Sequence, residues 1–269
     1  MEWTGKVVLI TGASRGVGEA LARRLAAAGA SVALAARAAG VGEGALEEVA
    51  ASIAQAGGSA LPVPTDLSDE AQVAAMVDTT AAHFGRLDML VNNAAMTGNS
   101  TDLFSDIALL RRGMAIDLWA PLLAARAAVP HMRAAGGGRI VNVTSLVGLA
   151  PIPNLMMYGV SKLGLERLTL DLAQQLRGDA IACNAFRIDL PVRERAELEN
   201  PRPGMRAKNL DYAEPAEVAA EGIAWMLEQG TDYTGRLESM RFLREREGIM
   251  PTQAKKIFPL RQKIAVPWP

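Results

Sequence analysis

The stretch Val7–Gly18 reads V-V-L-I-T-G-A-S-R-G-V-G and carries the clearest structural signal in the chain. Its first five residues are apolar or β-branched, which predicts a short strand that is buried on both faces. Three glycines follow, Gly12, Gly16 and Gly18, and they predict a tight turn that opens a helix. We therefore interpret the stretch as a strand that runs through a glycine-rich turn directly into a helix.

The rest of the chain repeats this alternation of short apolar runs and longer helical patterns. Strands are predicted at Val7–Thr11, Ser31–Ala35, Ala60–Val63, Met89–Val91, Arg139–Thr144 and Ala180–Phe186, with a last short strand near Arg236–Met240. Helices are predicted at Gly18–Ala28, Glu43–Ala56, Asp69–Phe84, Phe104–Ala135, Tyr158–Leu176 and Pro215–Gln229. This alternation predicts an α/β fold with a doubly wound, Rossmann-type parallel sheet in a three-layer αβα single domain.

We place the Rossmann-type domain at residues 1–240. Within it, residues from about 188 to 213 are rich in charge and proline and lack periodicity. They form either a substrate loop over the ligand crevice or a surface loop without a role. The C-terminal basic tail, residues 241–269, carries seven Lys or Arg against two Glu. A tail in solvent, or one packed on a neighbouring subunit, is favoured over a tail that binds an anionic partner.

Composition excludes several classes of partner. A formal net charge of −1 over 269 residues gives no reason to expect nucleic acid or an acidic membrane surface. The single cysteine, Cys183, excludes an intrachain disulfide, and nothing points to an oxidising compartment. We expect no signal peptide, no membrane span and no metal site, and hence a cytoplasmic protein.

The glycine-rich turn also has a chemical interpretation. At the first strand–helix junction of an α/β fold, such a turn is typical of a dinucleotide-binding loop. Gly16 and Gly18 would leave room for a pyrophosphate and for close packing of the helix on the strand. Backbone N–H groups at the start of the helix, around Ser14, Arg15 and Val17, would then meet phosphate. The alternative is a purely structural turn, since turns need glycine in any case.

The residues after the second strand indicate which dinucleotide is bound. Folds that bind NAD(H) place an acidic residue there to hold the ribose 2′-hydroxyl. This chain instead reads Ala33-Leu34-Ala35-Ala36-Arg37, without a carboxylate. Arg15, inside the glycine turn, and Arg37 could bracket a 2′-phosphate with their planar guanidinium groups. The pattern favours NADP(H) over NAD(H), although either arginine alone could be a surface charge.

Tyr158 and Lys162 form a candidate catalytic pair, because four residues apart on a predicted helix they share one face. Free tyrosine has a pKa of about 10, and a neighbouring ammonium lowers that pKa, so that Tyr158 could act as general acid or base. An exposed helix face is the alternative. Ser145 strengthens the case, because it ends the apolar run 138–144 at the edge where the ligand crevice lies. Its hydroxyl could donate a hydrogen bond to a carbonyl oxygen.

With these motifs together, the chain resembles the single-domain branch of the short-chain dehydrogenase/reductase family, over about Gly5 to Met240. The motifs that carry the resemblance are Thr11-Gly12-Ala13-Ser14-Arg15-Gly16-Val17-Gly18, Asp66-Leu67, Asn92-Asn93-Ala94-Ala95, Ser145, and Tyr158-Gly159-Val160-Ser161-Lys162. The spacing from the serine to the tyrosine also matches. Each motif is weak alone, but together they are specific.

The resemblance implies a role for each residue. Tyr158 would give or take the proton, Lys162 would hold the nicotinamide ribose and lower the pKa of Tyr158, and Ser145 would orient the substrate. Asp66 would bind the adenine edge, and Asn93–Ala94 would run beside the adenosine ribose. The expected catalytic set is Ser145, Tyr158, Lys162 and Asp117. The expected cofactor-binding set is Gly12, Ser14, Arg15, Gly16, Val17, Gly18, Arg37, Asp66, Leu67, Asn93, Ala94, Ala95, Tyr158, Lys162 and Ile188.

Three departures from the family pattern stand out. Asp117 replaces an Asn whose backbone carbonyl, in the family, helps hold a water in the proton relay to lysine. An ionised Asp accepts but cannot donate hydrogen bonds, so we hypothesise a working relay with a shifted pH profile. Ala95 replaces a glycine, which should be tolerated. The Pro-Gly element after the sixth strand is missing, and an ungapped match puts Pro191 where a backbone N–H is needed, unless Val192 supplies it.

The segment 146–157 and Met96 would form an apolar wall, which suits an apolar ketone, aldehyde or secondary alcohol. Packing of this segment on the core or on another subunit is the alternative. Arg187 and Arg193 could bind an anionic group, but charged loop residues are usually solvated. The resemblance implies a homodimer or homotetramer that pairs the helices at Phe104–Ala135 and Tyr158–Leu176. An isomerase, epimerase or lyase on the same site, or a non-catalytic NADP(H)-binding regulator, are the alternative functions.

Overall fold

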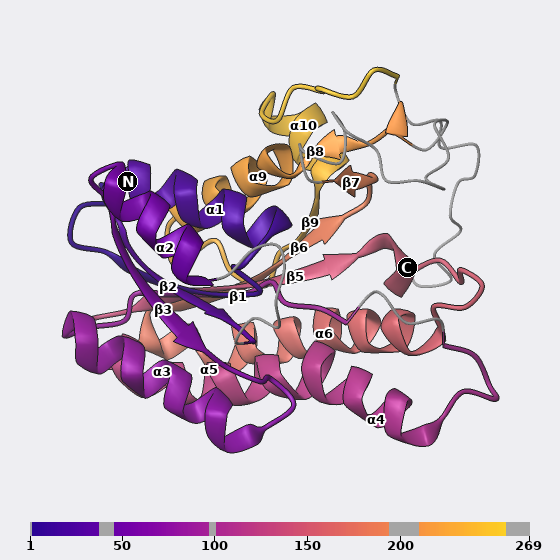
Figure 1. Ribbon diagram of the computed structural model, residues 1–269, viewed down its shortest axis with the longest axis horizontal. Helices are drawn as coiled ribbons and strands as arrows, with labels where there is room; N and C mark the ends of the chain where they lie inside the picture. The colour runs from indigo at the N-terminus through magenta and orange to yellow at the C-terminus, as the bar shows by residue number, and fades with distance from the viewer. Residues whose placement is uncertain (1, 38–45, 97–100, 194–209, 257–269) are drawn as a thin grey trace.

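Seven parallel strands form one sheet at the centre of the molecule (Figure 1). The computed structural model describes residues 2–37, 46–96, 101–193 and 210–256. The strands are β1 (Val7–Thr11), β2 (Ser31–Ala36), β3 (Ser59–Pro64), β4 (Met89–Asn92), β5 (Gly138–Ser145), β6 (Ile181–Ile188) and β9 (Leu237–Ser239). Their order is β3-β2-β1-β4-β5-β6-β9, which confirms the predicted doubly wound, Rossmann-type sheet.

Helices cover both faces of the sheet and complete the predicted three layers (Figure 1). One layer holds α1 (Gly16–Ala27), α2 (Leu46–Gln55) and α9 (Ala216–Glu228), and the other holds α3 (Glu70–Phe84), α5 (Ala120–Ala134) and α6 (Met156–Gln175). Residues 43–45, which we predicted as the start of the second helix, lie outside the described residues. None of the helices in the described ranges is long and apolar enough to span a lipid bilayer.

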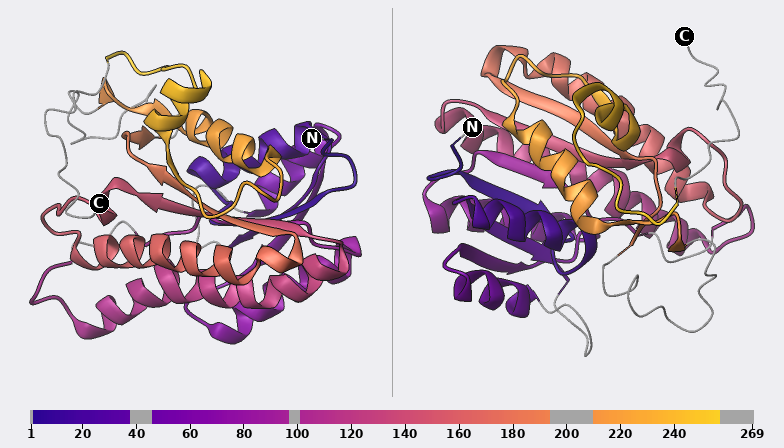
Figure 2. Two further views of the ribbon diagram at one scale, coloured as in Figure 1. Left: turned by 180° about the vertical axis from the view of Figure 1, so that it is seen from behind. Right: turned by 90° about the horizontal axis from the view of Figure 1, so that it is seen from above.

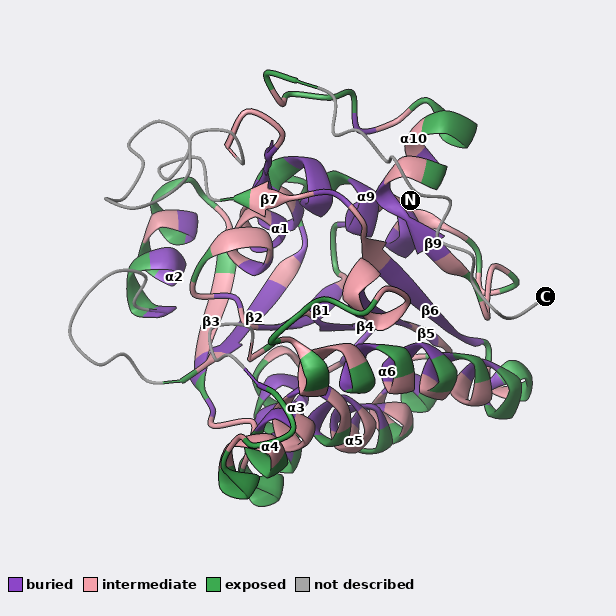
Figure 3. Cartoon of the chain, turned by 90° about the vertical axis from the view of Figure 1, so that its right-hand side faces the viewer, coloured by how far each residue is buried: buried purple, intermediate pink, exposed green. Residues whose placement is uncertain are grey.

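The alternation of side chains along β1 explains the two buried faces. Val8 and Ile10 pack toward α1 in one apolar cluster, whereas Val7 and Leu9 belong to the cluster on the opposite face. Successive side chains of a strand point to opposite sides, so a strand covered on both sides needs a continuous apolar run. Figure 3 shows these strands buried between the two layers of helices.

The predicted helix Phe104–Ala135 forms as one helical run, but it starts only at Ile107 and contains a π-helical turn. The structure has α4 (Ile107–Met114), a π-helical turn at Ala115–Trp119, and then α5. A π-helical turn fits an extra residue into the helix and is frequent at functional sites. It contains Asp117, whose side chain is buried with only 1% of the residue exposed.

Folded structure continues past the predicted boundary at residue 240. Helix α10 (Met240–Glu247) starts there, and Leu243 and Met250 are buried in the same apolar cluster as α9. Figure 2 shows α10 beside α9 at one side of the sheet. The basic tail is therefore in part a packed element, whereas residues 257–269 lie outside the described residues.

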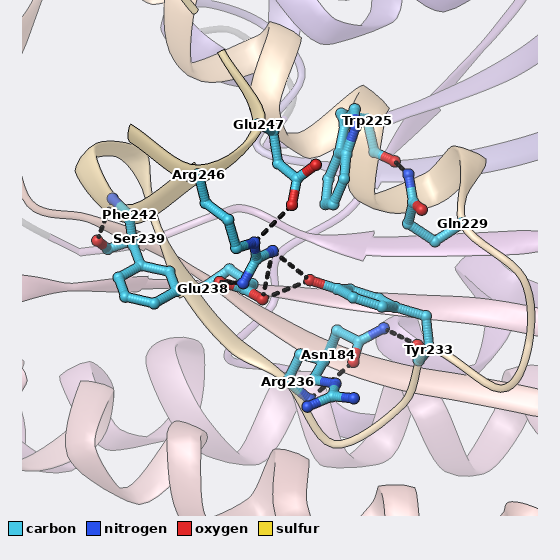
Figure 4. A network of polar contacts seen from close by, with 10 residues as sticks. All are labelled: Asn184, Trp225, Gln229, Tyr233, Arg236, Glu238, Ser239, Phe242, Arg246 and Glu247. Carbon is cyan, nitrogen blue, oxygen red and sulfur yellow. Dashed lines mark hydrogen bonds and ion pairs between the residues drawn. The ribbon is translucent and has the colours of Figure 1, made fainter. Parts of the chain in front are cut away.

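Polar contacts hold α10 against the sheet (Figure 4). The guanidinium of Arg246 in α10 donates to Glu238 of β9 at 3.0 Å and to the hydroxyl of Tyr233 at 3.2 Å. Tyr233 itself donates to Glu238. These contacts join the segment before β9, the strand and the helix after it, which explains why the chain stays folded beyond the sheet.

Two short strands close the base of the predicted substrate loop. β7 (Val192–Arg193) pairs in parallel with β8 (Glu214–Pro215), and the Glu214 N–H donates to the Pro191 carbonyl at 2.8 Å. Strand β6 extends to Ile188, so the first residue assigned to this loop is the last of a strand. Residues 194–209, the middle of the loop, lie outside the described residues.

Candidate active site

The predicted site residues gather at the carboxyl edge of the sheet, around the ends of β1 to β6, at the π-helical turn and at the start of α6. In the strand order, β1 and β4 are neighbours at the point where the connections reverse direction. Open α/β sheets bind their ligands in the crevice at such a switch point. Further along the edge, Ser145 at the end of β5 is paired in register with Ile188 at the end of β6.

The glycine turn between β1 and α1 has no room for a side chain at Gly12 or Gly18. Gly12 and Gly16 have φ values of +68° and +59°, in the left-handed region that glycine adopts without strain. A Cβ on Gly18 would lie 2.3 Å from the Gly12 carbonyl oxygen and 2.6 Å from the side-chain nitrogen of Asn93. Helix α1 therefore starts close against the loop that follows β4, as close helix–strand packing requires.

Thr11 and Asn93 lock the two loops of the switch point together. The Oγ1 of Thr11 accepts the backbone N–H groups of Asn93 at 3.0 Å and Ala94 at 3.1 Å. In return, the side-chain amide of Asn93 donates to the Thr11 carbonyl at 2.9 Å. We did not expect a role for Thr11 from the sequence, although its position directly before the glycine turn could have indicated one.

The start of α1 suits an anionic group. Arg15 is the N-cap residue, has an extended backbone, and supplies no side-chain capping hydrogen bond. The first-turn N–H groups therefore have no side-chain acceptor, and such groups attract phosphate. The side chains of Arg15 and Arg37 are both exposed, and β1 pairs with β2 in register up to Thr11 and Ala35, so both arginines follow strand ends at the same edge.

Asp66 follows β3 at this edge and has more partners than the sequence indicated. Its Oδ1 accepts the N–H and the hydroxyl of Ser68 at 2.9 and 2.7 Å, and its Oδ2 pairs with Arg112 of α4 at 3.0 Å. These hydrogen bonds, led by that of the Ser68 hydroxyl, hold the pKa of Asp66 below its ordinary value. The ionised carboxylate thus stays an acceptor, but Arg112 already occupies one of its oxygens.

Tyr158, Lys162 and Ser145 come together at the start of α6 and the end of β5. The Lys162 ammonium lies 5.6 Å from the centroid of the Tyr158 ring and donates to the Val143 carbonyl at 2.8 Å. Burial raises the pKa of Tyr158 to about 12, and a hydrogen bond with Ser145 acts in the opposite direction. We expected the neighbouring ammonium to lower the pKa of Tyr158; in this structure burial raises that pKa, and the charge of Asp117 adds to the rise.

Asp117 connects the π-helical turn to both the β4 loop and α6. Its Oδ1 accepts the Met96 N–H at 2.7 Å. Burial raises the pKa of Asp117, while the charge of Lys162 and the hydrogen bonds of Met96 and Ser161 lower it. Burial lowers the pKa of Lys162, which is only 2% exposed, and Asp117 counteracts this shift. The two side chains are thus a buried, electrostatically coupled pair of opposite charge.

Comparison with known proteins identifies this arrangement. A family model described as short chain dehydrogenase matches residues 6–188. The chain belongs to the short-chain dehydrogenase/reductase family. The match ends at Ile188, the last residue of β6 and the point where the family's Pro-Gly element is missing from this chain.

Several members of this family are similar over most of their length. The chain is 37% identical to a cis-4-hydroxycyclohexanecarboxylate dehydrogenase of Sinomonas cyclohexanicum, over 85% of this chain and 91% of that protein. It is 37% identical to a 7alpha-hydroxysteroid dehydrogenase of Clostridium sardiniense, over 73% of this chain and 74% of that protein. A short chain dehydrogenase from Burkholderia cenocepacia J2315, solved in complex with NADP, superposes with a TM-score of 0.78 at 29% identity, over 89% of this chain and 97% of that one.

These relationships give the general activity. The protein is a short-chain dehydrogenase/reductase, an oxidoreductase that acts on a hydroxyl or carbonyl group of a small molecule with a nicotinamide cofactor. A Cβ on Gly12 or Gly18 would meet neighbouring atoms, and α1 starts without a side-chain cap. Both features fit such a cofactor.

Next to Ser145, the family pattern is replaced by charged side chains. Arg187 of β6 forms two hydrogen bonds of 2.8 Å with Glu166 of α6 and so is not free to bind an anionic ligand. Asp189 accepts the backbone N–H of Arg241 in α10 at 3.2 Å. Sequence reasoning missed Glu166 entirely, and only its position four residues after Lys162 could have indicated it.

Proposed function

We propose that this protein is an NADP(H)-dependent oxidoreductase in which Tyr158 is the general acid or base. The observation that carries the proposal is the placement of the buried Lys162 ammonium 5.6 Å from the centroid of the Tyr158 ring, beside the strand that ends in Ser145. The Ser145 hydroxyl can donate a hydrogen bond, and the Tyr158 hydroxyl can give or take a proton. Together they suit a carbonyl oxygen that gains negative charge during the reaction.

The raised pKa of Tyr158 determines the protonation state of the site. With a pKa of about 12, the Tyr158 phenol is neutral at pH 7 and can donate a proton to a carbonyl oxygen during reduction. In the reverse direction it must first lose that proton, so alcohol oxidation requires more alkaline conditions. Ser145 orients the oxygen, and Lys162 supplies a nearby positive charge.

The cofactor would extend along the carboxyl edge from β2 to β6. When bound, its nicotinamide supplies or accepts the hydride. Arg15 and Arg37 would bind the 2′-phosphate, since both side chains are exposed at the ends of β1 and β2 and no carboxylate follows β2 before residue 38. The remaining cofactor contacts would come from Gly12, Ser14, Gly16, Val17, Gly18, Asp66, Leu67, Asn93, Ala94, Ala95, Tyr158, Lys162 and Ile188.

The proposed substrate is an alicyclic secondary alcohol or the corresponding ketone. The segment before Tyr158 is apolar and half-buried to exposed, with Ile152 and Met156 both open to solvent. Such side chains make an apolar wall for a ring system. The two curated relatives described above act on a hydroxycyclohexanecarboxylate and on a hydroxysteroid, which supports a ring-bearing substrate here.

A homodimer or homotetramer would use the outer face of α4 and α6. Large apolar side chains are exposed along it, including Ile107, Trp119, Val160 and Leu163. An apolar hollow of about 440 Å³ lies between the two helices, with Trp119 in its lining. An apolar patch of this kind marks a surface that is covered in the assembled protein.

The test is NADPH oxidation against a panel of cyclic ketones, with NADH in parallel, for the wild type and Tyr158→Phe. We expect turnover with NADPH and a loss of about 10²- to 10⁴-fold in kcat upon substitution, with NADPH binding retained. Tyr233→Phe is the matched control, because Tyr233 precedes β9 at the opposite edge of the sheet.

Each other outcome points to a different function. Tight NADPH binding without turnover of any panel member would indicate a non-catalytic regulator. Formation of product without net change in NADPH would indicate an isomerase, epimerase or lyase. Equal turnover in Tyr158→Phe would remove Tyr158 from the proposed role.

A further inference from the structure

A buried carboxylate lies one helical turn behind the proposed catalytic lysine. Glu166 follows Lys162 by four residues on α6 and Tyr158 by eight, so the three share a helix face. The Glu166 side chain is 5% exposed and that of Arg187 is 17% exposed. Neither residue has been assigned a part in the reaction so far.

Three short hydrogen bonds converge on the Glu166 carboxylate. Arg187 donates from Nε to Oε1 and from Nη2 to Oε2, each at 2.8 Å. Thr144 donates from its hydroxyl to Oε1 at 2.9 Å. The donors come from β6 and β5, whereas the acceptor comes from α6, so a single carboxylate ties two strand ends to the helix that carries Tyr158.

The hydrogen bonds to Glu166 lie close to the proposed substrate and nicotinamide positions. Thr144 and Arg187 are paired in register between β5 and β6, and the next pair is Ser145 and Ile188. The hydrogen bonds to Glu166 therefore lie one residue behind the serine proposed to orient the substrate. They lie equally close to the loop where backbone groups would hold the nicotinamide.

Stability alone gives no reason for a buried ion pair at this place. Well-packed apolar side chains of similar volume often stabilise a core as well or better. A guanidinium that meets a carboxylate through two parallel hydrogen bonds differs because it fixes direction as well as distance. In this chain the Pro-Gly element that would restrict the backbone after β6 is absent; Arg187 and Ile188 are the last residues of the strand, and Asp189-Leu190-Pro191 follow it.

We propose that Glu166 is a positioning residue, which acts through Arg187 and Thr144. It holds Ser145 and Ile188 at a fixed distance from Tyr158 and Lys162. Side-chain contacts thereby take over the restriction that a Pro-Gly element would place on the backbone after β6. This inference rests on the proposed function, because it assumes that the nicotinamide end of the cofactor lies against these residues.

The experiment compares the wild type with Glu166→Gln and measures two dissociation constants in addition to kcat. One is that of NADPH, and the other is that of adenosine 2′,5′-bisphosphate, which contacts only the adenosine end. The glutamine amide puts an N–H₂ group where one carboxylate oxygen accepted from Arg187, so one of the two parallel hydrogen bonds is lost. We expect kcat to fall about tenfold to a hundredfold and NADPH to bind several-fold more weakly, with binding of the bisphosphate unchanged.

Two further variants complete the design. Arg167→Gln removes the exposed ion pair of Arg167 with Asp171 on the same helix, and we expect no change in any of the three quantities. Thr144→Val removes one hydrogen bond without leaving a buried charge unpaired. It should shift kcat and NADPH binding in the same direction as Glu166→Gln but less. If Glu166→Gln does not fold, Thr144→Val tests the positioning role in its place.

A purely structural role gives a different pattern. In that case Glu166→Gln or Thr144→Val lowers the melting temperature but leaves kcat per folded molecule and the ratio of the two dissociation constants unchanged, which would overturn the proposal. A wild type that binds neither NADPH nor the bisphosphate contradicts the proposed function instead, so the two failures are distinguishable.

Discussion

The two ends of the proposed cofactor site are built in different ways. At the adenosine end, Gly12 and Gly18 bring backbone atoms close together, and Thr11 and Asn93 join neighbouring loops through neutral hydrogen bonds. At the nicotinamide end, buried charged groups make the connections, with Glu166 joined to Arg187 and Lys162 coupled to Asp117.

The two ends should tolerate different kinds of substitution. A turn made of closely packed backbone has no space for an added atom, so steric contact between backbone atoms fixes its geometry. An ion pair fixes geometry through long side chains, and it adds charges whose influence reaches the neighbouring titratable groups. Substitutions should therefore act through packing at the first end and through electrostatics at the second.

Gly18→Ala tests the packing end and should have the largest effect. The new Cβ would overlap the Gly12 carbonyl oxygen, so we expect a loss of about 2–3 kcal/mol in the free energy of unfolding and at least tenfold weaker NADPH binding. Denaturant unfolding and a binding titration measure both. Gly178→Ala is the control, because a Cβ there has no neighbour within 4 Å and the φ of Gly178 is not positive. If both variants behaved like the wild type, the contrast between the two ends would not hold.

The packing end is also the one that the sequence predicts well. The strand at Val7–Thr11 was predicted with the bounds that the structure shows, and the glycine turn leads into α1 as expected. Both signals are local: apolar residues that fill both faces of a strand, and glycines at positions where the backbone turns. The sheet order follows from the same regularity, since strand–helix alternation allows few arrangements.

The electrostatic end could not be predicted in the same way. Glu166 and Arg187 are 21 residues apart, and the chain has 28 Lys or Arg and 29 Asp or Glu that could pair. Nothing in the sequence selects this pair. The π-helical turn at Ala115–Trp119 is similar, because its Asp117 is tied to Met96 by a contact that exists only once the fold has formed.

The pKa of Tyr158 shows where sequence reasoning gave the wrong direction. A lysine four residues away predicts a lowered pKa, but burial is the larger influence and raises it to about 12. Burial depends on how α6 packs against β5, which spacing along the helix does not reveal. The proximity of Tyr158 and Lys162 could thus be predicted from the chain, whereas the direction of the pKa shift of Tyr158 could not.

Arg37→Ala tests the charge proposed at the adenosine end and should have an intermediate effect. If its guanidinium binds the 2′-phosphate, we expect the KM for NADPH to rise about tenfold, while the KM for NADH stays within twofold. Steady-state kinetics with both cofactors measures the change, and NADH is the internal control. An equal rise in KM for NADPH and NADH would mean that Arg37 does not bind the 2′-phosphate.

Asp117→Asn tests the electrostatic end and should have the smallest effect on rate, but a definite one on pH dependence. The negative charge of Asp117 raises the pKa of Tyr158. Without that charge the pKa of Tyr158 falls, so the rising limb of alcohol oxidation should move to lower pH. Since burial raises the pKa of Asp117, the wild type and the variant should converge at acidic pH, where Asp117 is protonated.

The control for this shift is Ser161→Ala, which removes a hydroxyl that lowers the pKa of Asp117 and donates to the Tyr158 carbonyl at 3.0 Å, but leaves the charge of Asp117 in place. That variant should not move the rising limb to lower pH. Profiles of kcat/KM against pH for the three proteins measure the shift directly. A profile of Asp117→Asn that coincides with the wild type would mean that the charge of Asp117 is not felt at Tyr158. The nicotinamide end would then be held by geometry alone, as the adenosine end is, and the electrostatic half of the contrast would rest on Glu166 and Arg187.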